Sequence, residues 1–304
     1  MKILIAEDDP VSRRLLEAKL TKWGYEVVVT RDGNEAWQVL QAGDAPRLAI
    51  LDWMMPGMDG ADLCREIRKE LKEPYTYIIL LTTLRSEEDI VTGMEAGADD
   101  YITKPFHGSE LKVRLRAGRR ILELEDELIS AREALRAKAT HDSLTGLWNH
   151  EEIMQILVRE LERADRENST LAVIMADLDY FKKINDTYGH LAGDAVLRLT
   201  AQRMVALIRP YDALGRYGGE EFLAIIPGYG TKSAASLAER LRECIGDESM
   251  DTPDGMIEVT ISLGIAIRDN GKPVDATFLV HAADMALYGA KDKGRNRVEV
   301  ASEK

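Results

Sequence analysis

The first hundred residues alternate short apolar runs with helical patterns such as SRRLLEAKLTKW, and this alternation limits the fold more than any other feature. Strands that alternate with helices form a parallel sheet that carries helices on both faces. We therefore predict a doubly wound α/β domain over residues 1–106. Its five strands are expected at Ile3–Ala6, Val27–Thr30, Leu48–Leu51, Ile78–Thr82 and Tyr101–Thr103.

Polar side chains stand at the ends of four of these strands, and they are Glu7, Asp8, Asp52, Thr82 and Lys104. The carboxyl ends of parallel strands share one edge of the sheet, where ligands gather. Carboxylates forced together there repel one another unless a cation joins them, and oxygen ligands at this density suit Mg²⁺. A carboxylate beside Mg²⁺ and a lysine can attack phosphorus, so this edge is a candidate phosphoryl-transfer site.

Four segments carry a resemblance to response-regulator receiver domains: EDD at 7–9, DWMMPGMDG at 52–60, LLTT at 80–83 and KPF at 104–106. The resemblance implies a flavodoxin-like fold, a cis Lys104–Pro105 peptide and a cognate histidine kinase as partner. It also implies roles for the strand-end residues. Asp52 is the expected phosphoacceptor; Glu7, Asp8 and the Met54 carbonyl join it in holding Mg²⁺; Thr82, Tyr101 and Lys104 are the expected switch residues.

Residues 110–140 have a continuous helical pattern in which Ile121, Leu128 and Leu135 repeat every seven residues, with Leu124 and Ala131 between them. That is about three heptads of coiled-coil character. We expect a receiver domain at 1–120, with its last helix starting near 107, and a dimerising helical stalk at 110–140. An amphipathic helix that lies on its own domain is the alternative.

HDSLTGLWNH breaks this helix, and residues 141–304 have the pattern of a second α/β domain. Strands are expected at Leu171–Leu178 and Ile257–Ile267, and a hairpin at Ala213–Ile226. Helices are expected at Ala192–Ile208, Lys232–Ile245 and Val274–Lys291.

The hairpin contains RPYDALGRYGGEEF, in which two glycines precede two glutamates. A turn at Gly218–Gly219 is readily explained by the positive φ that short hairpin turns need, whereas glutamate is depleted in strands. A glycine turn lets the backbone approach a phosphate closely. Asp177 at the end of the preceding strand and Glu220 together suit Mg²⁺ on a triphosphate, since Mg²⁺ usually takes one or two carboxylates plus phosphates.

Two further pairs point to a nucleotide. Lys291 and Arg295 are four residues apart, so they share a helix face and can reach the same phosphates. Asn185 and Asp194 are candidates for reading a base edge, and an aspartate accepts hydrogen bonds from guanine that adenine does not offer.

GGEEF, FKKIND, the GD at 193–194, KGRN and DSLTGLWN together resemble the GGDEF family of diguanylate cyclases over nearly all of residues 141–304. The family comparison implies a nucleotide-cyclase-like domain with the following roles. The cyclase metal ligands are Asp177, the Leu178 carbonyl and Glu220; the catalytic residues are Glu220, Glu221 and Arg216; guanine binds Asn185 and Asp194; the phosphates bind Lys182, Lys291 and Arg295.

The resemblance implies that two GTP molecules become cyclic di-GMP and two pyrophosphates. One GTP per domain is not enough, so a homodimer formed through the receiver and the stalk is expected. Arg209 and Asp212, with Arg240, match the family's inhibitory product site. His150 replaces the usual arginine of the opening motif, a change that is expected to weaken a domain-edge contact without removing catalysis.

The net charge of −13 argues against binding to nucleic acid or to an anionic membrane. Two widely separated cysteines and the lack of a long apolar segment favour a cytoplasmic protein. Three alternatives stay open: a non-catalytic cyclic di-GMP receptor, a cyclase with an adenine-containing product, and a DNA-binding regulator. The acidic turn, Asp194 and the absence of a basic helix-turn-helix pattern disfavour them in that order.

Overall fold

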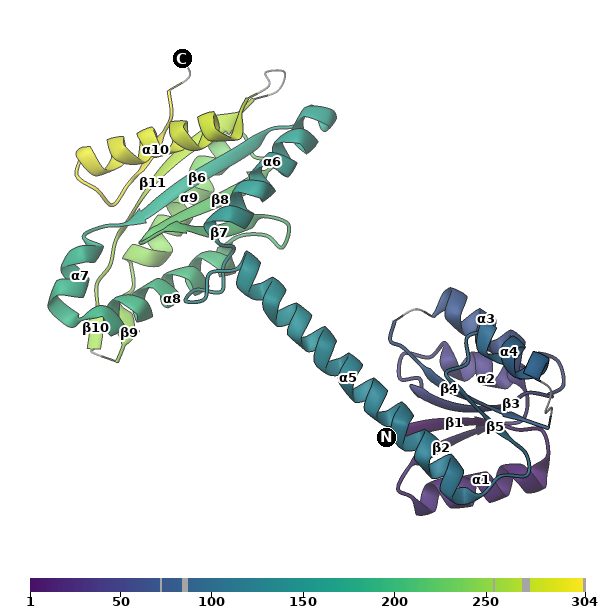
Figure 1. Cartoon of the computed structure of the whole chain (residues 1–304). Coiled ribbons are helices and arrows are strands. Elements are labelled where there is room, and N and C mark those ends of the chain that lie inside the picture. Colours follow the sequence, from purple (N-terminus) through teal and green to yellow (C-terminus); the bar gives the residue numbers. More distant parts are fainter. Residues whose placement is uncertain (72, 84–86, 254, 270–273, 303–304) are drawn as a thin grey trace. The chain divides into compact units, whose positions relative to one another are not determined.

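The computed structural model describes residues 1–304 except 72, 84–86, 254, 270–273 and 303–304 (Figure 1). The chain divides into two compact units, residues 1–132 and 133–304. Helix α5 (Gly108–Thr140) crosses the division. Each unit has its own sheet and its own hydrophobic core, so each is described by itself.

The first unit is built on a five-stranded parallel sheet with the strand order β2-β1-β3-β4-β5. The strands are β1 (Lys2–Ala6), β2 (Glu26–Thr30), β3 (Leu48–Asp52), β4 (Tyr77–Thr82) and β5 (Asp100–Thr103). The helices that follow them are α1 (Pro10–Lys22), α2 (Gly33–Leu40), α3 (Gly60–Glu70), α4 (Glu87–Glu95) and α5. The predicted doubly wound sheet is therefore confirmed, with its strands at nearly the expected residues.

Alternation along the buried strands places helices on both faces of this sheet. Leu4 and Leu51 pack with side chains of α2 and α3 on one face, whereas Ile5 and Ile50 pack with α1 and α5 on the other. Aspartates begin three of the helices, because the side chains of Asp9, Asp32 and Asp59 each accept a hydrogen bond from a backbone N–H of the first turn.

The first part of α5 lies on the first unit. Its leucines at 111, 115 and 122 are buried there, and at Gly118 a Cβ would lie 2.5 Å from the ring of Tyr77, so the helix approaches the sheet closely. Arg47 then forms ion pairs with Glu125 at 2.7 Å and with Asp126 at 2.5 Å. For this stretch the alternative prediction of a helix lying on its own domain is correct.

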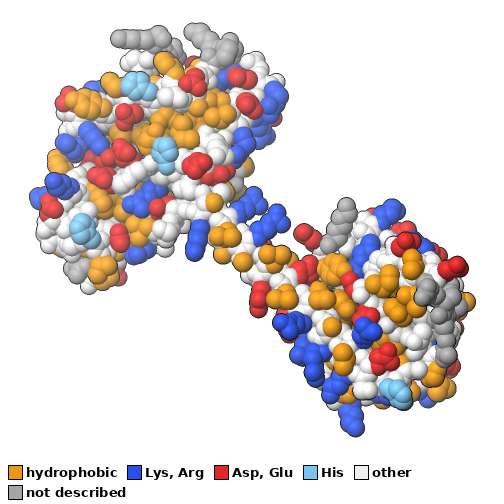
Figure 2. All heavy atoms as spheres, viewed as in Figure 1, with side chains coloured by type: hydrophobic (Ala, Val, Ile, Leu, Met, Phe, Trp, Pro, Cys, Tyr) orange, Lys and Arg blue, Asp and Glu red, His pale blue; other side chains and the backbone are white. Residues whose placement is uncertain are grey.

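Other apolar side chains of α5 are exposed, and Figure 2 shows hydrophobic side chains along this helix. Leu128 and Leu135 keep 68% and 67% of their surface, and Ile121 and Leu124 are exposed as well. These four residues, which we call the α5 stripe, are the predicted heptad positions.

The second unit contains a five-stranded sheet with the order β12-β11-β6-β8-β7, antiparallel except for the β11–β12 pair. Its strands are β6 (Leu171–Leu178), β7 (Ala213–Gly218), β8 (Glu221–Pro227), β11 (Ile261–Arg268) and β12 (Val298–Val300), and a separate hairpin joins β9 (Met250–Thr252) to β10 (Gly255–Ile257). The helices are α6 (His150–Glu167), α7 (Phe181–Tyr188), α8 (His190–Leu207), α9 (Thr231–Gly246) and α10 (Ala276–Asp292). Side chains of α6 and α10 cover one face of the sheet, and side chains of α7, α8 and α9 cover the other.

Two expectations for the second unit are wrong in detail. Gly218 is the last residue of β7 and pairs with Glu221, because a register shift between Arg216 and Gly218 moves the turn to Gly219–Glu220. Glu220 therefore lies in the turn and not in the strand. The strand expected at 257–267 is split into β10 and β11, because β10 pairs with β9 outside the main sheet.

Candidate active sites

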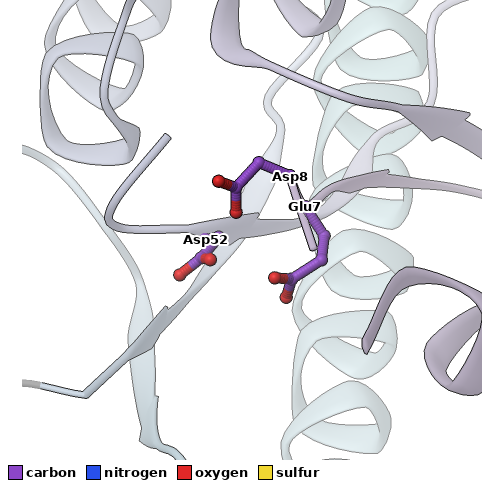
Figure 3. A group of neighbouring side chains, drawn as sticks. All are labelled: Glu7, Asp8 and Asp52. Carbon is purple, nitrogen blue, oxygen red and sulfur yellow. The ribbon is translucent and has the colours of Figure 1, made fainter. Parts of the chain in front are cut away.

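Three carboxylates meet at the carboxyl edge of the first sheet (Figure 3). Glu7 and Asp8 follow β1, and Asp52 ends β3; ligand oxygens of the three lie within 4.8 Å of one another. The Lys104 ammonium lies 2.7 Å from Glu7 and 2.9 Å from Asp52. The predicted convergence is thus present, and the lysine already neutralises part of the negative charge.

Glu7 is the group in this cluster whose surroundings best suit a bound cation. It is 1% exposed, and its Oε1 is buried without a hydrogen-bond partner among the described residues. Burial, opposed by Lys104 and reinforced by Asp52, raises the pKa of Glu7 to about 7. A hard cation that prefers oxygen ligands would satisfy this oxygen, so the donor set fits Mg²⁺.

The other expected receiver residues surround this cluster. Thr82 is buried at the end of β4, and its carbonyl accepts a hydrogen bond of 2.7 Å from the Lys104 N–H. Tyr101 is half-buried on β5, and the Met54 side chain is exposed. The Lys104–Pro105 peptide is cis, as predicted. The roles expected of Tyr101 and of the Met54 carbonyl stay predictions.

Strand register brings the acids of the second unit together. Asp177 on β6 pairs directly with Glu221 on β8. Glu220 precedes Glu221 in the turn, and its carbonyl accepts a hydrogen bond from the Leu178 N–H at 3.4 Å. Gly219 has a φ of 43°, which a glycine adopts without the strain of a side chain. Gly219 therefore contributes a turn position with no Cβ beside these carboxylates.

Lys291 on α10 completes this acidic group through an ion pair of 2.7 Å with Asp177. Burial raises the pKa of Asp177, and Lys291 offsets part of that effect. Burial also raises the pKa of Glu221, with Asp177 adding to the shift. Neighbouring carboxylates that repel one another and have raised pKa values are typical of a functional site. Here the Lys291 ammonium on α10 lies beside them.

Arg216 has partners that the sequence did not reveal. Its guanidinium pairs with Asp142 at 3.1 Å and donates to the Gly219 carbonyl at 2.9 Å. Thr145 holds the same Asp142 carboxylate through two hydrogen bonds. These contacts link the DSLT motif to the GG turn and favour a structural role for Arg216; its expected contact with the transferring group stays a prediction.

The expected nucleotide contacts lie on α7, α8 and the end of α10. Asn185 and Asp194 are half-buried on α7 and α8, which meet so closely that a Cβ on Gly193 would lie 1.9 Å from the Asn185 side-chain oxygen. Lys182 is exposed on α7, and Arg295 lies just after α10 with its guanidinium 4.6 Å from the centre of the Tyr180 ring.

The RxxD segment forms a closed turn after α8. The Asp212 carboxylate accepts from the Arg209 N–H at 2.8 Å, and the Arg209 guanidinium lies 4.7 Å from the centre of the Tyr229 ring. Asp212 Oδ1 is buried without a partner among the described residues, and burial raises the pKa of this carboxyl. A cavity of about 380 Å³ reaches both Arg209 and Asp212. Arg240 is exposed on α9.

Sequence reasoning missed several residues in these sites. No local sequence pattern marks Asp142 or Tyr229 as a site residue, although Asp142 is the first residue of DSLTGLWN. Asp179 was also missed, although DLD at 177–179 places a second acid just beyond β6. His150, the departure from the usual motif, lies with its ring 4.5 Å from the ring of Tyr217.

Comparisons with known proteins agree with this division into two domains. Residues 3–116 match the response regulator receiver domain, and residues 139–297 match the diguanylate cyclase GGDEF domain. Among the helices that the structure describes, none combines the length and apolarity needed to cross a membrane.

Similar proteins include a response regulator and a diguanylate cyclase. The response regulator PleD of Caulobacter vibrioides is 26% identical over 98% of each chain, and the diguanylate cyclase DgcP of Pseudomonas aeruginosa is 35% identical over 69% of this chain and 32% of its own. The coiled coil and GGDEF domain of DgcB from Caulobacter crescentus, solved with c-di-GMP, is 32% identical over 63% of this chain and 99% of that structure, with a TM-score of 0.56. Because the GGDEF match spans more than half of the residues, the chain belongs to the GGDEF family of diguanylate cyclases, with a response-regulator receiver domain in its N-terminal part.

Proposed function

We propose that this cyclase acts as a homodimer that condenses two GTP molecules into cyclic di-GMP, under control of phosphorylation at Asp52 and with inhibition by its product. The observation that carries the proposal is the group formed by Asp177, Glu221 and Lys291 beside the GG turn. Two carboxylates and a cation there suit a nucleotide triphosphate and the metal that accompanies it.

In the proposed reaction, the 3′-hydroxyl oxygen of one GTP attacks the α-phosphorus of the other, and pyrophosphate leaves. Glu220, which the turn holds next to Asp177, takes the hydroxyl proton. Asp177, Glu220 and the Leu178 carbonyl would hold Mg²⁺, which neutralises charge on the phosphates. Lys182, Lys291 and Arg295 bind the phosphates, and the carboxylate and amide of Asp194 and Asn185 bind guanine.

The α5 stripe supports a dimer of two copies of this chain. A single site of this kind binds one GTP, so two cyclase domains must face each other for each 3′-hydroxyl to meet the other α-phosphate. Exposed leucines at heptad spacing are typical of a helix that pairs with a second copy, because pairing removes their apolar surface from water.

Phosphorylation by a cognate histidine kinase is proposed as the input. The Asp52 carboxylate attacks the phosphorus of the kinase's phosphohistidine, the P–N bond breaks and the histidine leaves. Lys104, which bridges Glu7 and Asp52 before the transfer, then neutralises the phosphoryl oxygens. Moving Lys104 and Thr82 toward the phosphoryl group changes the receiver surface, and the equilibrium shifts toward dimers whose cyclase domains meet.

Product inhibition is proposed at Arg209 and Asp212. Asp212 offers a buried oxygen that finds no partner within the described part of the chain, and Arg209 offers a guanidinium beside an aromatic ring. This combination suits a guanine edge and a phosphate. Arg240 is the proposed third contributor.

The test is incubation of the purified protein with GTP and Mg²⁺, with and without beryllofluoride as a phosphoryl mimic, followed by chromatography of the nucleotides. We expect cyclic di-GMP in both samples and more of it with beryllofluoride. Asp52→Asn should keep the lower rate and lose the increase. Absence of product under all conditions would contradict the cyclase proposal, whereas an adenine-containing product in a mixture of ATP and GTP would contradict the guanine assignment.

A further inference from the structure

Asp179 is a buried carboxylate just beyond β6 whose hydrogen bonds reach other segments. Its side chain, 4% exposed, accepts hydrogen bonds of 2.7 Å from the Ser262 hydroxyl, 2.7 Å from the Thr260 hydroxyl and 3.0 Å from the Asn296 N–H. Both carboxylate oxygens therefore act as acceptors that tie the end of β6 to other segments.

Tyr180, which follows Asp179, contacts Arg295, which precedes Asn296. The Arg295 guanidinium lies 4.6 Å from the centre of the Tyr180 ring, close enough for a cation–π contact. Two consecutive residues after β6 therefore hold two consecutive residues of the KGRN segment, residues 293–296.

The backbone at this junction is unusual. Tyr180, Arg295 and Asn296 have φ values of 54°, 65° and 45°, and they are three of the four non-glycine residues with positive φ in the described chain. Left-handed φ values are unfavourable for residues with a Cβ and persist only where surrounding contacts impose them. The bonds to Asp179 and the ring of Tyr180 supply such contacts.

Asn296 is also held from its other side. The Arg242 guanidinium on α9 donates to the Asn296 side-chain oxygen at 2.9 Å, and Glu239 braces Arg242 at 2.8 Å. The KGRN segment is thus fixed between β6 and α9. A hydrogen bond of 3.0 Å from the Arg295 N–H to the Ala290 carbonyl also ties it to α10.

We propose that Asp179 is a positioning residue for the cyclase: it holds the KGRN segment so that Arg295 faces the nucleotide phosphates. The inference rests on the phosphate contacts of the proposed function. Asp179 lies two residues after Asp177, so the same strand end sets both the carboxylate that pairs with Lys291 and the bond that fixes the loop. Without that bond Arg295 remains in the chain but loses its fixed orientation.

The test compares binding of two probes to the whole 304-residue chain by calorimetry: GMP, and a GTP analogue with a non-cleavable α–β bridge. Asp179→Ala should raise the Kd of the triphosphate analogue about tenfold, as expected for the loss of a hydrogen bond to a charged group, and leave the Kd of GMP nearly unchanged. Asp179→Asn should largely restore the affinity, because an amide oxygen still accepts from the Asn296 N–H.

Arg295→Ala and the double variant Asp179→Ala/Arg295→Ala complete the cycle. We expect the double variant to bind the analogue no more weakly than Arg295→Ala, since Asp179 acts through that side chain. If Arg295→Ala does not weaken binding of the analogue, the proposed phosphate role is wrong. If it does, and Asp179→Ala either has no effect or weakens GMP equally, the positioning role alone is wrong.

If Asp179→Asn behaves like Asp179→Ala, charge and not hydrogen bonding is what matters, and the proposal fails. If Asp179→Ala does not fold, Arg242→Ala decides: it removes the other contact to Asn296, and it must weaken the triphosphate analogue selectively, or the proposal is overturned.

Discussion

Each of the two units places a lysine beside carboxylates at a strand end. The two sites differ in the number of carboxylates that lie close together. In the receiver, Lys104 bridges Glu7 and Asp52, and three carboxylates lie within reach of one cation. In the cyclase, Lys291 pairs with Asp177 alone, and the described residues there form no such three-carboxylate cluster.

Strand geometry explains the difference. Parallel strands deliver Glu7, Asp8 and Asp52 to one edge. In the cyclase, Asp177 is as buried as Asp52, whereas Glu220 and Glu221 are half-buried at the end of a hairpin. Under the proposed function, the receiver site is complete within one chain and the cyclase site needs a second copy.

The largest effect is expected from Glu220→Ala, which tests the cyclase half directly. Removing a general base lowers rates by about 10²–10⁴-fold, so cyclic di-GMP formation should fall within that range. Beryllofluoride binding to the receiver, followed by tryptophan fluorescence, should be unchanged. Glu162→Ala, an exposed glutamate on α6, is the control and should keep full activity. Equal, measurable turnover by the Glu220 variant and the wild type would exclude Glu220 as the general base, and no turnover by either would favour the non-catalytic receptor.

Leu128→Glu tests whether cyclase activity needs a second copy of the chain, which the receiver site does not need. A carboxylate in the α5 stripe would be desolvated on pairing, so the dimer Kd should rise at least about 100-fold. Light scattering and turnover at several protein concentrations provide the measurement. Ser130→Glu, at an exposed position between the heptad residues, is the control. The stalk assignment is wrong if Leu128→Glu matches wild type in both assays when dilute.

Arg209→Ala separates the product site from the catalytic half. Loss of hydrogen bonds to a charged group should weaken inhibition by cyclic di-GMP about 10–100-fold and leave initial turnover largely intact. Initial rates measured with increasing added product will show this. Arg198→Ala, an exposed arginine on α8, should be inhibited like the wild type. Normal inhibition of the Arg209 variant would remove the RxxD segment from the regulatory scheme.

The smallest effect concerns pH at the receiver. Burial raises the pKa of Glu7 to about 7, so Glu7 is protonated below that pH and must lose its proton to hold a cation. Mg²⁺ affinity of the receiver should therefore fall about tenfold from pH 8 to pH 6. Tryptophan fluorescence is a suitable readout, because Trp53 adjoins Asp52. Glu7→Gln, which cannot titrate, should bind weakly with little change over this range; a similar slope in that variant would exclude Glu7 as the titrating group.

The same pKa has a consequence for metal-free stability. The folded pKa of Glu7 lies above its ordinary value of 4.5, so the folded state holds the proton more tightly than the unfolded state. The contribution of Glu7 to the stability of the metal-free receiver is thus fully present below about pH 4.5, and it is lost as the pH rises through 7. Added Mg²⁺ should reverse this decline, because it binds the ionised form.

Much of both sites follows from local patterns. The alternation of apolar runs with helices predicted the parallel sheet, and therefore which residues meet at its edge. Asp177 and the GG segment were likewise readable, since a buried strand and a glycine turn are signals within a few residues. The predicted turn was one residue too early, because the bulge at Tyr217 depends on pairing between β7 and β8 and cannot be read from either segment alone.

The sequence by itself determined the two domains, the acids at the strand ends and the exposed heptads of α5, because each depends on periods and turns within one short segment. Only the tertiary structure decided that Arg216 is held by Asp142 and that Asp179 holds Asn296, a residue 117 positions away. Such contacts arise when sheet register and loop closure bring distant segments together. The physical reason is that hydrogen bonding of a buried carboxylate is set by whatever backbone the fold delivers to it, and not by its neighbours along the chain.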